Sequence, residues 1–409
     1  MRRRPRPGVR IVVLLSLSAF VGFVPSCSPE TGDRRLVTQV ETTDSAGVSR
    51  VRILDLFGLG IPEVTARRVW TTDVSELHEV RDAWIEADGS VLLANAGNAE
   101  IVRLDSTGDI MARFGAAGEG PGEFAQFGLS WIDGSRDGRI AAYDERLARI
   151  TEFAPDGTVL GTHRVAPSGD RISLQVVAYL AEGRILATYG DVRRSDREGL
   201  ARDTVPLLSI PFGEAADSPE SAAVASVDTL GLWPGQERQI SRTPEGAARV
   251  PVGFANDFLY DGAGRVAAVS PSEAVELRVF EEGQLVVTVE ADAPPRAVRA
   301  EDADALREDL AARSPDRALD DLWSEAPVNE IYPTLDRIVV TQDGSVWMGI
   351  HPEFREDRRT FILIGRRGFP VGRLRLPKEA TVLAVRGDRA VVSTGTEPEE
   401  ERIALLNIE

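Results

Sequence analysis

The chain has 409 residues, of which 43% are apolar and 27% are charged, a composition typical of a folded globular protein. Its formal net charge is -18, and it is -23 without residues 1–26, which hold five arginines and no acidic residue. A surface this acidic repels nucleic acid and anionic lipid head groups, so the composition argues against nucleic-acid binding and favours neutral or cationic partners.

The first 26 residues have the pattern of a secretory signal peptide. The basic start RRRPRPGVR precedes the apolar run IVVLLSLSAFVGFV, which is too short for an ordinary membrane-spanning helix. Cys27 follows shortly after and is the only cysteine of the chain, so it cannot form an internal disulfide. A lone cysteine behind an apolar segment is better explained as the site of a lipid anchor than as a core thiol.

The residues VPSC at the end of this segment resemble the bacterial lipobox, in which the cysteine is lipidated and becomes the new first residue. The resemblance implies cleavage after Ser26 and lipid attachment at Cys27. Residues 27–35 are expected to form a flexible tether. Because Ser28 rather than an aspartate follows the cysteine, we expect the protein in the bacterial cell envelope, lipid-anchored on the periplasmic or surface side of the outer membrane.

From about residue 36 to residue 409 the chain repeats one unit: an apolar strand, a turn that ends in glycine, a second strand, a polar loop and a third strand. The clearest copies, residues 84–115 and 131–159, both begin with Trp-Ile and contain Asp-Gly, a pair that suits tight hairpin turns. Weaker copies cover residues 176–189, 258–270, 338–350 and 382–394. The expected hairpin glycines are Gly89, Gly138, Gly183, Gly264, Gly344 and Gly387.

Six units predict an all-β fold, a six-bladed β-propeller with four-stranded antiparallel blades. Each blade is apolar on both faces and must be covered by its neighbours, so we expect the ring to close. Residues 34–54 are β-rich and precede the first full unit, and we expect them to supply a strand to the last blade. Trp84, Trp131 and Trp347 are expected to pack between blades.

Two stretches lengthen the spacing between units and are predicted to be insertions. The first, at about residues 190–250, is acidic, rich in alanine and punctuated by proline; it is interpreted as a loop, and its part GEAADSPESAAVAS, residues 213–226, is expected to be exposed. The second, residues 296–328, contains a short predicted helix that starts near Ala300, between the fourth and fifth blades, with acidic residues in its first turn. We hypothesise that this helix partly caps the axial opening of the ring.

The glycine-rich stretch FGAAGEGPGEF, residues 114–124, allows two interpretations: a phosphate-binding loop or a crossover between two blades. A phosphate loop of the Walker type needs a lysine and a hydroxyl group after its last glycine, and neither follows Gly122. Glu119 and Glu123 would also repel an anion. The sequence therefore predicts a crossover that lies beside the loop NAGNAE, residues 95–100.

The repeats, together with GEGPGEF at residues 118–124 and YPTLDRIVVTQDGSVWMG at residues 332–349, resemble the six-bladed β-propeller lipoproteins of bacteria, which are relatives of NHL-repeat propellers. The resemblance covers about residues 36–409 and implies the propeller fold. Propellers of this kind serve many functions, so the resemblance does not fix an activity.

We expect a lipid-anchored binding or scaffold module that contacts a protein, peptide or glycan through its loop face, binds no nucleic acid and is a monomer. The alternative is a metal-dependent hydrolase or lyase, similar to propeller lactonases, with a divalent ion such as calcium on the axis. The sequence assigns no catalytic residue, no metal ligand and no cofactor. The candidate residues of the loop face are Asn95, Asn98, Glu119, Glu123, Asp144, Arg146 and His351; for the Asp and Asn side chains the alternative is turn capping.

Overall fold

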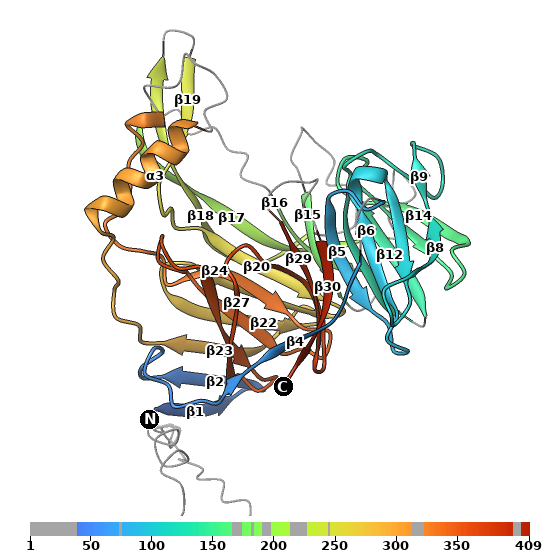
Figure 1. Cartoon of the computed structure of the whole chain (residues 1–409), viewed down its shortest axis with the longest axis horizontal. Coiled ribbons are helices and arrows are strands. Elements are labelled where there is room, and N and C mark those ends of the chain that lie inside the picture. The colour runs from blue at the N-terminus through green and yellow to red at the C-terminus, as the bar shows by residue number, and fades with distance from the viewer. Residues whose placement is uncertain are drawn as a thin grey trace, which may run out of the picture.

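The computed structural model describes residues 39–72, 76–136, 138–165, 174–180, 184–189, 198–212, 227–243, 246–312, 323–395 and 402–409. The predicted signal peptide, Cys27 and the tether lie outside these residues. Within them, the strands form six sheets of four to six strands and one small two-stranded sheet, and one α-helix, α3 (Ala300–Ala312), lies outside the sheets (Figure 1). In this described part of the chain, no helix is long and apolar enough to cross a membrane.

We number the six sheets as blades in chain order. Blade 1 contains β5 (Val80–Ile85), β6 (Val91–Asn95), β7 (Glu100–Leu104) and β8 (Ile110–Phe114). Blade 2 contains β11 (Leu129–Arg136), β12 (Arg139–Asp144), β13 (Arg149–Phe153) and β14 (Val159–Arg164). Blade 3 contains β15 (Leu174–Tyr179), β16 (Arg184–Tyr189), β17 (Gly199–Pro211), β18 (Asp228–Thr243) and β19 (Gly246–Pro251).

The last three blades combine strands from both ends of the chain. Blade 4 contains β20 (Phe258–Ala263), β21 (Val266–Pro271), β22 (Val275–Glu281) and β23 (Gln284–Ala291), with β2 (Val48–Ile53) and β1 (Val40–Ser45) beyond β23. Blade 5 contains β24 (Leu335–Val340), β25 (Val346–Ile350), β26 (Arg358–Ile364), β27 (Pro370–Pro377) and β3 (Glu63–Val64). Blade 6 contains β28 (Thr381–Arg386), β29 (Arg389–Thr394), β30 (Arg402–Ile408) and β4 (Ala66–Thr72). Blades 1, 2 and 6 thus have the four strands predicted, and the other three have more.

A separate hydrophobic cluster fills each contact between neighbouring blades. Consecutive residues of a strand point to opposite faces of its sheet, so Leu92 of β6 packs against blade 2 and Leu93 packs against blade 6. The same alternation joins every blade to two neighbours. Because blade 6 packs on blade 1, the six sheets close into a ring, the arrangement of a six-bladed β-propeller. The pairs that represent the six contacts, in order from blades 1 and 2 to blades 6 and 1, are Trp84–Ile132, Trp131–Tyr179, Trp233–Phe258, Leu277–Ile362, Trp347–Ala404 and Leu405–Leu93.

The prediction that Trp84, Trp131 and Trp347 pack between blades is therefore confirmed. The hairpin turns are also confirmed where the structure describes them. The glycines at these turns, Gly89, Gly138, Gly264, Gly344 and Gly387, all have positive φ, which side chains with a Cβ rarely adopt. Gly183 lies outside the described residues.

The strand that closes the ring differs from the prediction. Residues 34–54 do not complete the last blade. Val40–Ser45 and Val48–Ile53 form a hairpin that extends blade 4, where β2 runs parallel to β23. The physical reason is the apolar side of β2, because Val51 and Ile53 fill the cluster between blades 4 and 5. Blade 6 is completed instead by β4, which pairs antiparallel to β30 and buries Trp70 against blade 1.

The first predicted insertion is largely strand rather than loop. Residues 199–211 and 228–243 form the long strands β17 and β18, which supply the third and fourth strands of blade 3. Their inward side chains, such as Leu207 and Trp233, are buried against blade 4, and this burial overrides the acidic, alanine-rich composition nearby. Residues 213–226, the most loop-like part of the prediction, lie outside the described residues.

The predicted helix of the second insertion is confirmed as α3, between blades 4 and 5. Figure 1 shows it beside β19, away from the body of the ring. Its buried Asp302 pairs with Arg355 of the loop after β25, with a distance of 3.0 Å between Nε and Oδ1. The Asn329 N–H donates to the Gly253 carbonyl at 3.0 Å, which ties the end of the insertion to the chain that follows β19.

The glycine-rich stretch joins β8 of blade 1 to β11 of blade 2, as the crossover interpretation predicts. It contains two short parallel strands, β9 (Ala116–Ala117) and β10 (Glu123–Phe124). The Phe127 N–H at its end donates to the Ala96 carbonyl at 2.9 Å, so the crossover lies beside the loop after β6. We call the face that carries the crossovers and the loops between second and third strands the loop face.

Candidate functional site

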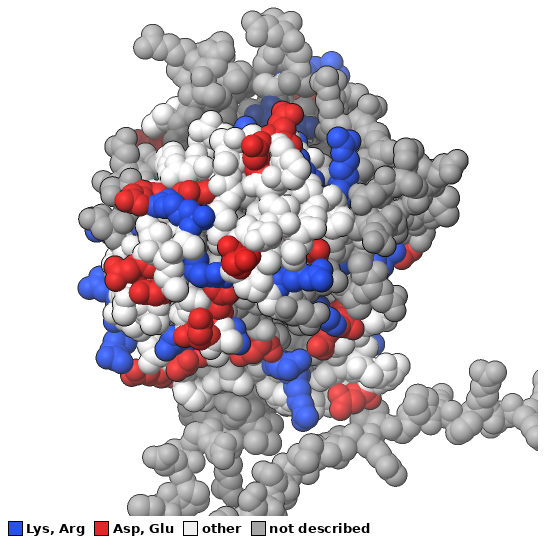
Figure 2. Space-filling model, turned by 90° about the vertical axis from the view of Figure 1, so that its right-hand side faces the viewer, with Lys and Arg blue, Asp and Glu red and all other residues white. Residues whose placement is uncertain are grey.

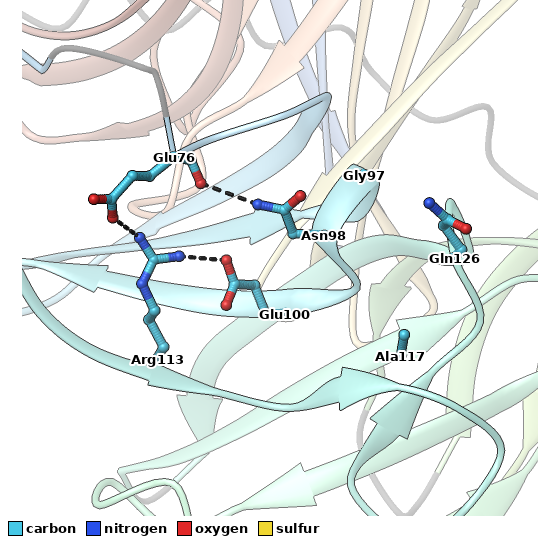
Figure 3. A pocket seen from close by; sticks show the side chains of 7 residues that line it. All are labelled: Glu76, Gly97, Asn98, Glu100, Arg113, Ala117 and Gln126. Atoms are coloured by element: carbon cyan, nitrogen blue, oxygen red, sulfur yellow. Dashed lines mark hydrogen bonds and ion pairs between the residues drawn. The ribbon is translucent and has the colours of Figure 1, made fainter.

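A broad pocket opens on blade 1 beside the glycine-rich crossover, and we call it the rim pocket (Figure 3). It measures about 590 Å³. Its central cation, Arg113 of β8, lies between the carboxylates of Glu76 and Glu100 and pairs with both. The Asn98 amide donates to the Glu76 carbonyl at 3.0 Å. The charged groups of the rim pocket therefore satisfy one another.

A second pocket lies at the centre of the ring, and we call it the axial pocket. The first strands of the blades surround this centre: β5 contacts β11 and β28, and β20 contacts β15 and β24. The pocket measures about 240 Å³. Gly262 in its wall allows β20 to approach β15, because a Cβ there would lie 2.0 Å from the Val177 carbonyl oxygen. The lining residues are Arg81, Asp82, Ser130, Trp131, Glu145, Gln175, Val176, Val177, Tyr260, Asp261 and Gly262.

The mouth of the axial pocket carries an ion-pair network around Arg81. Its guanidinium donates to Glu79 Oε1 at 2.7 Å, to Glu145 Oε1 at 3.0 Å and to the Phe127 carbonyl at 3.0 Å. The Arg81 and Glu145 side chains are each 27% exposed, so water reaches this network. One cation is thus held between two carboxylates, and the mouth carries a net negative charge.

Two carboxyl groups form the floor of the axial pocket, and both bind the first strand of the next blade. Asp82 Oδ2 accepts the Ile132 N–H at 2.8 Å, and Asp261 Oδ2 accepts the Val340 N–H at 2.6 Å. A smaller cavity lies beneath them, lined by both residues together with Gln342 and Leu383. The accessible surface that Asp82 and Asp261 keep therefore faces cavities inside the ring.

Burial sets the charge of this floor. It raises the pKa of Asp82 well above its usual value, although hydrogen bonds from Ile132 and Ala83 oppose the shift. Burial likewise raises the pKa of Asp261 to about 7, against hydrogen bonds from Val340 and Gly262 and the nearby positive charge of Arg337. At neutral pH, Asp261 is therefore about half ionised, and the raised pKa of Asp82 favours its neutral form.

Tyr260 and Gln175 form the polar wall of the pocket. The Tyr260 hydroxyl donates to Gln175 Oε1, which joins the first strands of blades 4 and 3. Burial, followed by the nearby carboxylates Asp257, Asp261 and Glu145, raises the pKa of Tyr260 to about 12. The phenol is therefore neutral, and the groups around it are mostly negative.

On the blade 5 side of the axis, Arg359 Nε donates to Asp336 Oδ2 at 2.8 Å; the Arg359 side chain is buried and that of Asp336 is half-buried. Burial raises the pKa of Asp336, although Arg359 opposes this shift, and burial lowers the pKa of Arg337. Arg359 also donates to the Lys378 carbonyl at 2.7 Å. This group holds together the loops of blades 5 and 6.

Four of the candidate residues predicted from the sequence are buried or half-buried, and the side chains of three of them accept backbone N–H groups of loops or turns. Asn95 is fully buried and accepts the His78 N–H at 2.7 Å. Asp144 is fully buried and caps the turn after β12 by accepting the Arg146 and Leu147 N–H groups at 2.9 Å. Glu123 accepts the N–H of Gly120 within its own loop at 2.7 Å. Turn capping, the structural alternative, thus describes the bonds of Asp144.

His351 is the fourth of these residues. It lies at the end of β25, with its ring 5.8 Å from the ring of Phe254 and 5.6 Å from that of Tyr332. Burial lowers the pKa of His351 to about 4, so the imidazole is neutral at pH 7.

The other candidates are exposed on the loop face. Asn98 lines the rim pocket. The Arg146 guanidinium lies 6.0 Å from the centre of the Phe127 ring. Glu119 is exposed, and its carbonyl accepts a bond from Arg149 at 2.6 Å. The structure does not bring the seven candidates together at one point, and their contact with a ligand stays a prediction.

Sequence reasoning missed the axial pocket. Most of its polar side chains come from the first strands of several units, where Arg81-Asp82 and Tyr260-Asp261 are adjacent. An ionisable side chain inside a strand that is otherwise mostly apolar was the available signal. Among the described residues, no group of three or more His, Cys, Asp or Glu side chains is arranged to hold a metal ion.

The buried floor predicts how stability depends on pH. Asp261 has a higher pKa in the folded protein than in the unfolded chain, where it is about 3.9, so its contribution is full below about pH 4 and is lost as pH rises through 7. We expect Asp261→Asn, which keeps an acceptor for Val340, to gain stability relative to the native protein between pH 5 and pH 8. Urea unfolding of both proteins across this range checks it, and a difference that does not change with pH would contradict it.

No family model and no curated protein matches the sequence. Among solved structures, a DUF4221 family member from Bacteroides vulgatus is 11% identical over 91% of this chain and 99% of its own, with a TM-score of 0.48. A virginiamycin B lyase of Staphylococcus aureus is 10% identical over 84% and 99%, with a TM-score of 0.39. A calcium-binding protein, regucalcin, of Agrobacterium tumefaciens is 10% identical over 85% and 95%, with a TM-score of 0.36. Sequence identity and structural similarity this low do not define a function.

Proposed function

We propose that the protein is a lipid-anchored binding protein of the bacterial cell envelope, which takes a small ligand in the axial pocket and meets a larger partner through the loop face. The observation that supports it most is the axial pocket, where four blades contribute polar side chains to one cavity of about 240 Å³. Pockets for small molecules combine apolar walls with a few converging polar groups, and Val176 and Val177 lie beside Gln175 and Tyr260 here.

The point where the chain enters the ring fits an anchor near the loop face. The Gln39 carbonyl accepts the Leu54 N–H at 2.8 Å, and Asp292, which follows β23 and leads to α3, accepts the Leu56 N–H at 2.9 Å. The start of β1 is therefore on the same side as the crossovers. Eleven residues lie between Cys27 and Gln39, and the twelve Cα–Cα steps span at most about 40 Å. A lipid at Cys27 would keep the loop face close to the bilayer.

The anchor gives a direct prediction. We expect Cys27→Ser to move the protein from the membrane fraction to the soluble fraction of its host, because one thioether-linked lipid group would hold the ring to the bilayer. Fractionation of the native and variant proteins, with intact mass measurement, checks this. A variant that remains in the membrane fraction, or a native protein without added lipid mass, would rule the anchor out.

The binding role is tested by a thermal-shift screen of the Cys27→Ser protein against neutral, anionic and cationic small molecules. Compounds that bind the axial pocket should raise the midpoint of the native protein and should lose this effect in Tyr260→Phe with Gln175→Leu. Asn98→Ala, in the rim pocket, is the matched control and should keep it. The proposal fails if no class of compound binds, or if binding is insensitive to the axial pair.

A second candidate, a metal-dependent hydrolase or lyase, is favoured by one observation: Asp82 lies close enough to Asp133 and Asp261 for their charges to raise its pKa. This role would require oxygen ligands at about 2.3–2.6 Å from a common point. It predicts that calcium raises and EDTA lowers the melting midpoint of the protein as isolated. A midpoint that neither treatment changes would remove this candidate.

A further inference from the structure

We propose that the ligand of the axial pocket is a small organic cation, an alkylammonium group whose charge lies between Glu145 and Asp261 and whose hydrocarbon stem lies against Val176 and Val177. This inference rests on the proposed binding function and adds the chemical class of the ligand. Three observations support it: the hydrogen-bond acceptors that the axial pocket presents, the bonds that already hold Arg81, the one cation in its lining, and the volume of the pocket.

The axial pocket presents several acceptor atoms to a ligand. Among the described residues, Glu145 uses one carboxylate oxygen for Arg81, which leaves the other for a ligand. The Tyr260 hydroxyl gives its proton to Gln175 and keeps its lone pairs. Asp261 adds carboxylate oxygens at the floor. An ammonium group brings up to three N–H donors and a positive charge, which complement this set.

The guanidinium in the pocket lining does not favour an anion. Arg81 is held by Glu79, Glu145 and the Phe127 carbonyl, so it brings one positive charge between two negative ones. Arg337 lies near Asp261 from blade 5, where it also pairs electrostatically with Asp336. Two further carboxyl groups act on the residues that line the pocket: Asp133 raises the pKa of Asp82, and Asp257 raises that of Tyr260. An anion would meet repulsion from most sides.

The electrostatic effects on Tyr260 and Asp82, which line the pocket, also favour a positively charged ligand. The carboxylates of Asp257, Asp261 and Glu145 all raise the pKa of Tyr260, and Asp261 raises that of Asp82. A bound cation would offset this negative field and lower the pKa of Asp261, so the protein should release protons when it binds. The release is a signature that binding of a neutral molecule would not give.

The size of the pocket limits the ligand. A volume of about 240 Å³ corresponds to roughly eight waters at about 30 Å³ each. An alkylammonium ion with a stem of a few carbons fits this space, and Val176 and Val177 offer it an apolar surface. Larger molecules would have to extend out of the pocket past the Arg81–Glu145 ion pair.

The test compares three probes of nearly equal size, n-butylammonium, 1-butanol and butyrate, at constant ionic strength by calorimetry. We expect n-butylammonium to bind at least about tenfold more tightly than the other two. Asp261→Asn and Glu145→Gln should each weaken it about tenfold, whereas Glu119→Gln, an exposed carboxylate of the loop face, should not. Measurements at pH 7 in phosphate and in HEPES, two buffers without a primary ammonium group, should show proton release, which Asp261→Asn should abolish.

Several results would overturn the inference. If butanol or butyrate binds as tightly as n-butylammonium and is lost in Tyr260→Phe, the pocket binds ligands but not through positive charge, and the proposed function survives. If n-butylammonium binds equally well to both carboxylate variants, its site is elsewhere. If none of the probes binds at millimolar concentration, the cation assignment falls, and the wider screen decides the binding role separately.

Discussion

Replacing Trp70 by alanine should destabilise the folded protein by about 3–5 kcal/mol, the usual cost of removing a large buried aromatic side chain. Trp70 is 8% exposed and lies on β4, opposite Leu405 of β30. It fills the cluster between blades 6 and 1 and covers Gly108. Loss of the indole leaves a cavity at the one contact that joins the end of the chain to its beginning. Urea unfolding measures the change.

The control for this experiment is Val69→Ala on the same strand. Val69 is 51% exposed, so its truncation should change the free energy of unfolding by less than about 0.5 kcal/mol. Equal effects of the two substitutions would mean that β4 does not bury Trp70 against blade 1. A small effect of Trp70→Ala alone would mean that the ring does not depend on closure at this contact.

Asp144→Ala should be nearly as destabilising, by about 3–5 kcal/mol, because it leaves several buried N–H groups without an acceptor. Asp144 is fully buried and accepts the Arg146 and Leu147 N–H groups, both at 2.9 Å. Its other oxygen accepts the Ala125 N–H at 2.6 Å, which ties the glycine-rich crossover to blade 2. We expect both a lower unfolding midpoint and faster proteolysis within residues 115–128.

Glu119→Ala is the matched control, since Glu119 lies in the same crossover and is exposed. It should leave stability and proteolysis of the crossover within the range of ordinary surface substitutions. Asp144→Asn keeps one acceptor oxygen and should fall between the native protein and Asp144→Ala. An alanine variant as resistant as the native protein would show that Asp144 does not hold the crossover.

The repeated blades could be predicted because their signals are local. An Asp-Gly or similar turn between two apolar strands is visible within about a dozen residues, and five of the six predicted glycines have the positive φ that such turns need. The tryptophans could be assigned to contacts between blades for the same reason, since large aromatic side chains in a two-sided sheet have to be covered. The hairpin turns depend on residues that are close in sequence, and the tryptophan contacts depend only on the adjacent blade.

The closure of the ring could not be predicted in this way. β4 pairs with β30, so residues 66–72 meet residues 402–408 across almost the whole chain. The sequence contains a second β-rich candidate, the hairpin β1–β2, whose composition is just as suitable. The choice between them depends on which side chains fill the contact between blades 6 and 1. Trp70 of β4 packs there, whereas Val51 and Ile53 of β2 pack between blades 4 and 5, and only the folded structure shows this difference.

The candidate site was predicted only in part, because loop residues were chosen for their polarity. Asn95 and Asp144 are polar because they satisfy buried backbone groups, and this requirement cannot be told apart from ligand binding in one sequence. The axial residues are separated by long stretches of chain and meet only when the ring forms. Their one local signal is an acidic residue within an apolar strand, as at Asp82 and Asp261.

The surface outside these sites carries mixed charge. Figure 2 views the molecule from the right-hand side of Figure 1, where β8 and β14 lie, and shows acidic and basic side chains interspersed around an uncharged area. Ion pairs such as Arg103–Glu86, with a distance of 2.8 Å between Nε and Oε2, balance part of the charge locally. The acidic excess of the chain is thus not gathered into one field on this side.

Disulfide trapping tests the closed ring most directly. In a Cys27→Ser background the chain has no other cysteine, and Arg67 lies opposite Asn407 in the pairing of β4 with β30. Arg67→Cys with Asn407→Cys should form a cross-link on mild oxidation, because such opposed positions bring the Cβ atoms to about 4–5.5 Å. Arg50→Cys on β2 with Asn407→Cys should not. A cross-link from residue 50, and none from residue 67, would show that the ring is closed by a different strand.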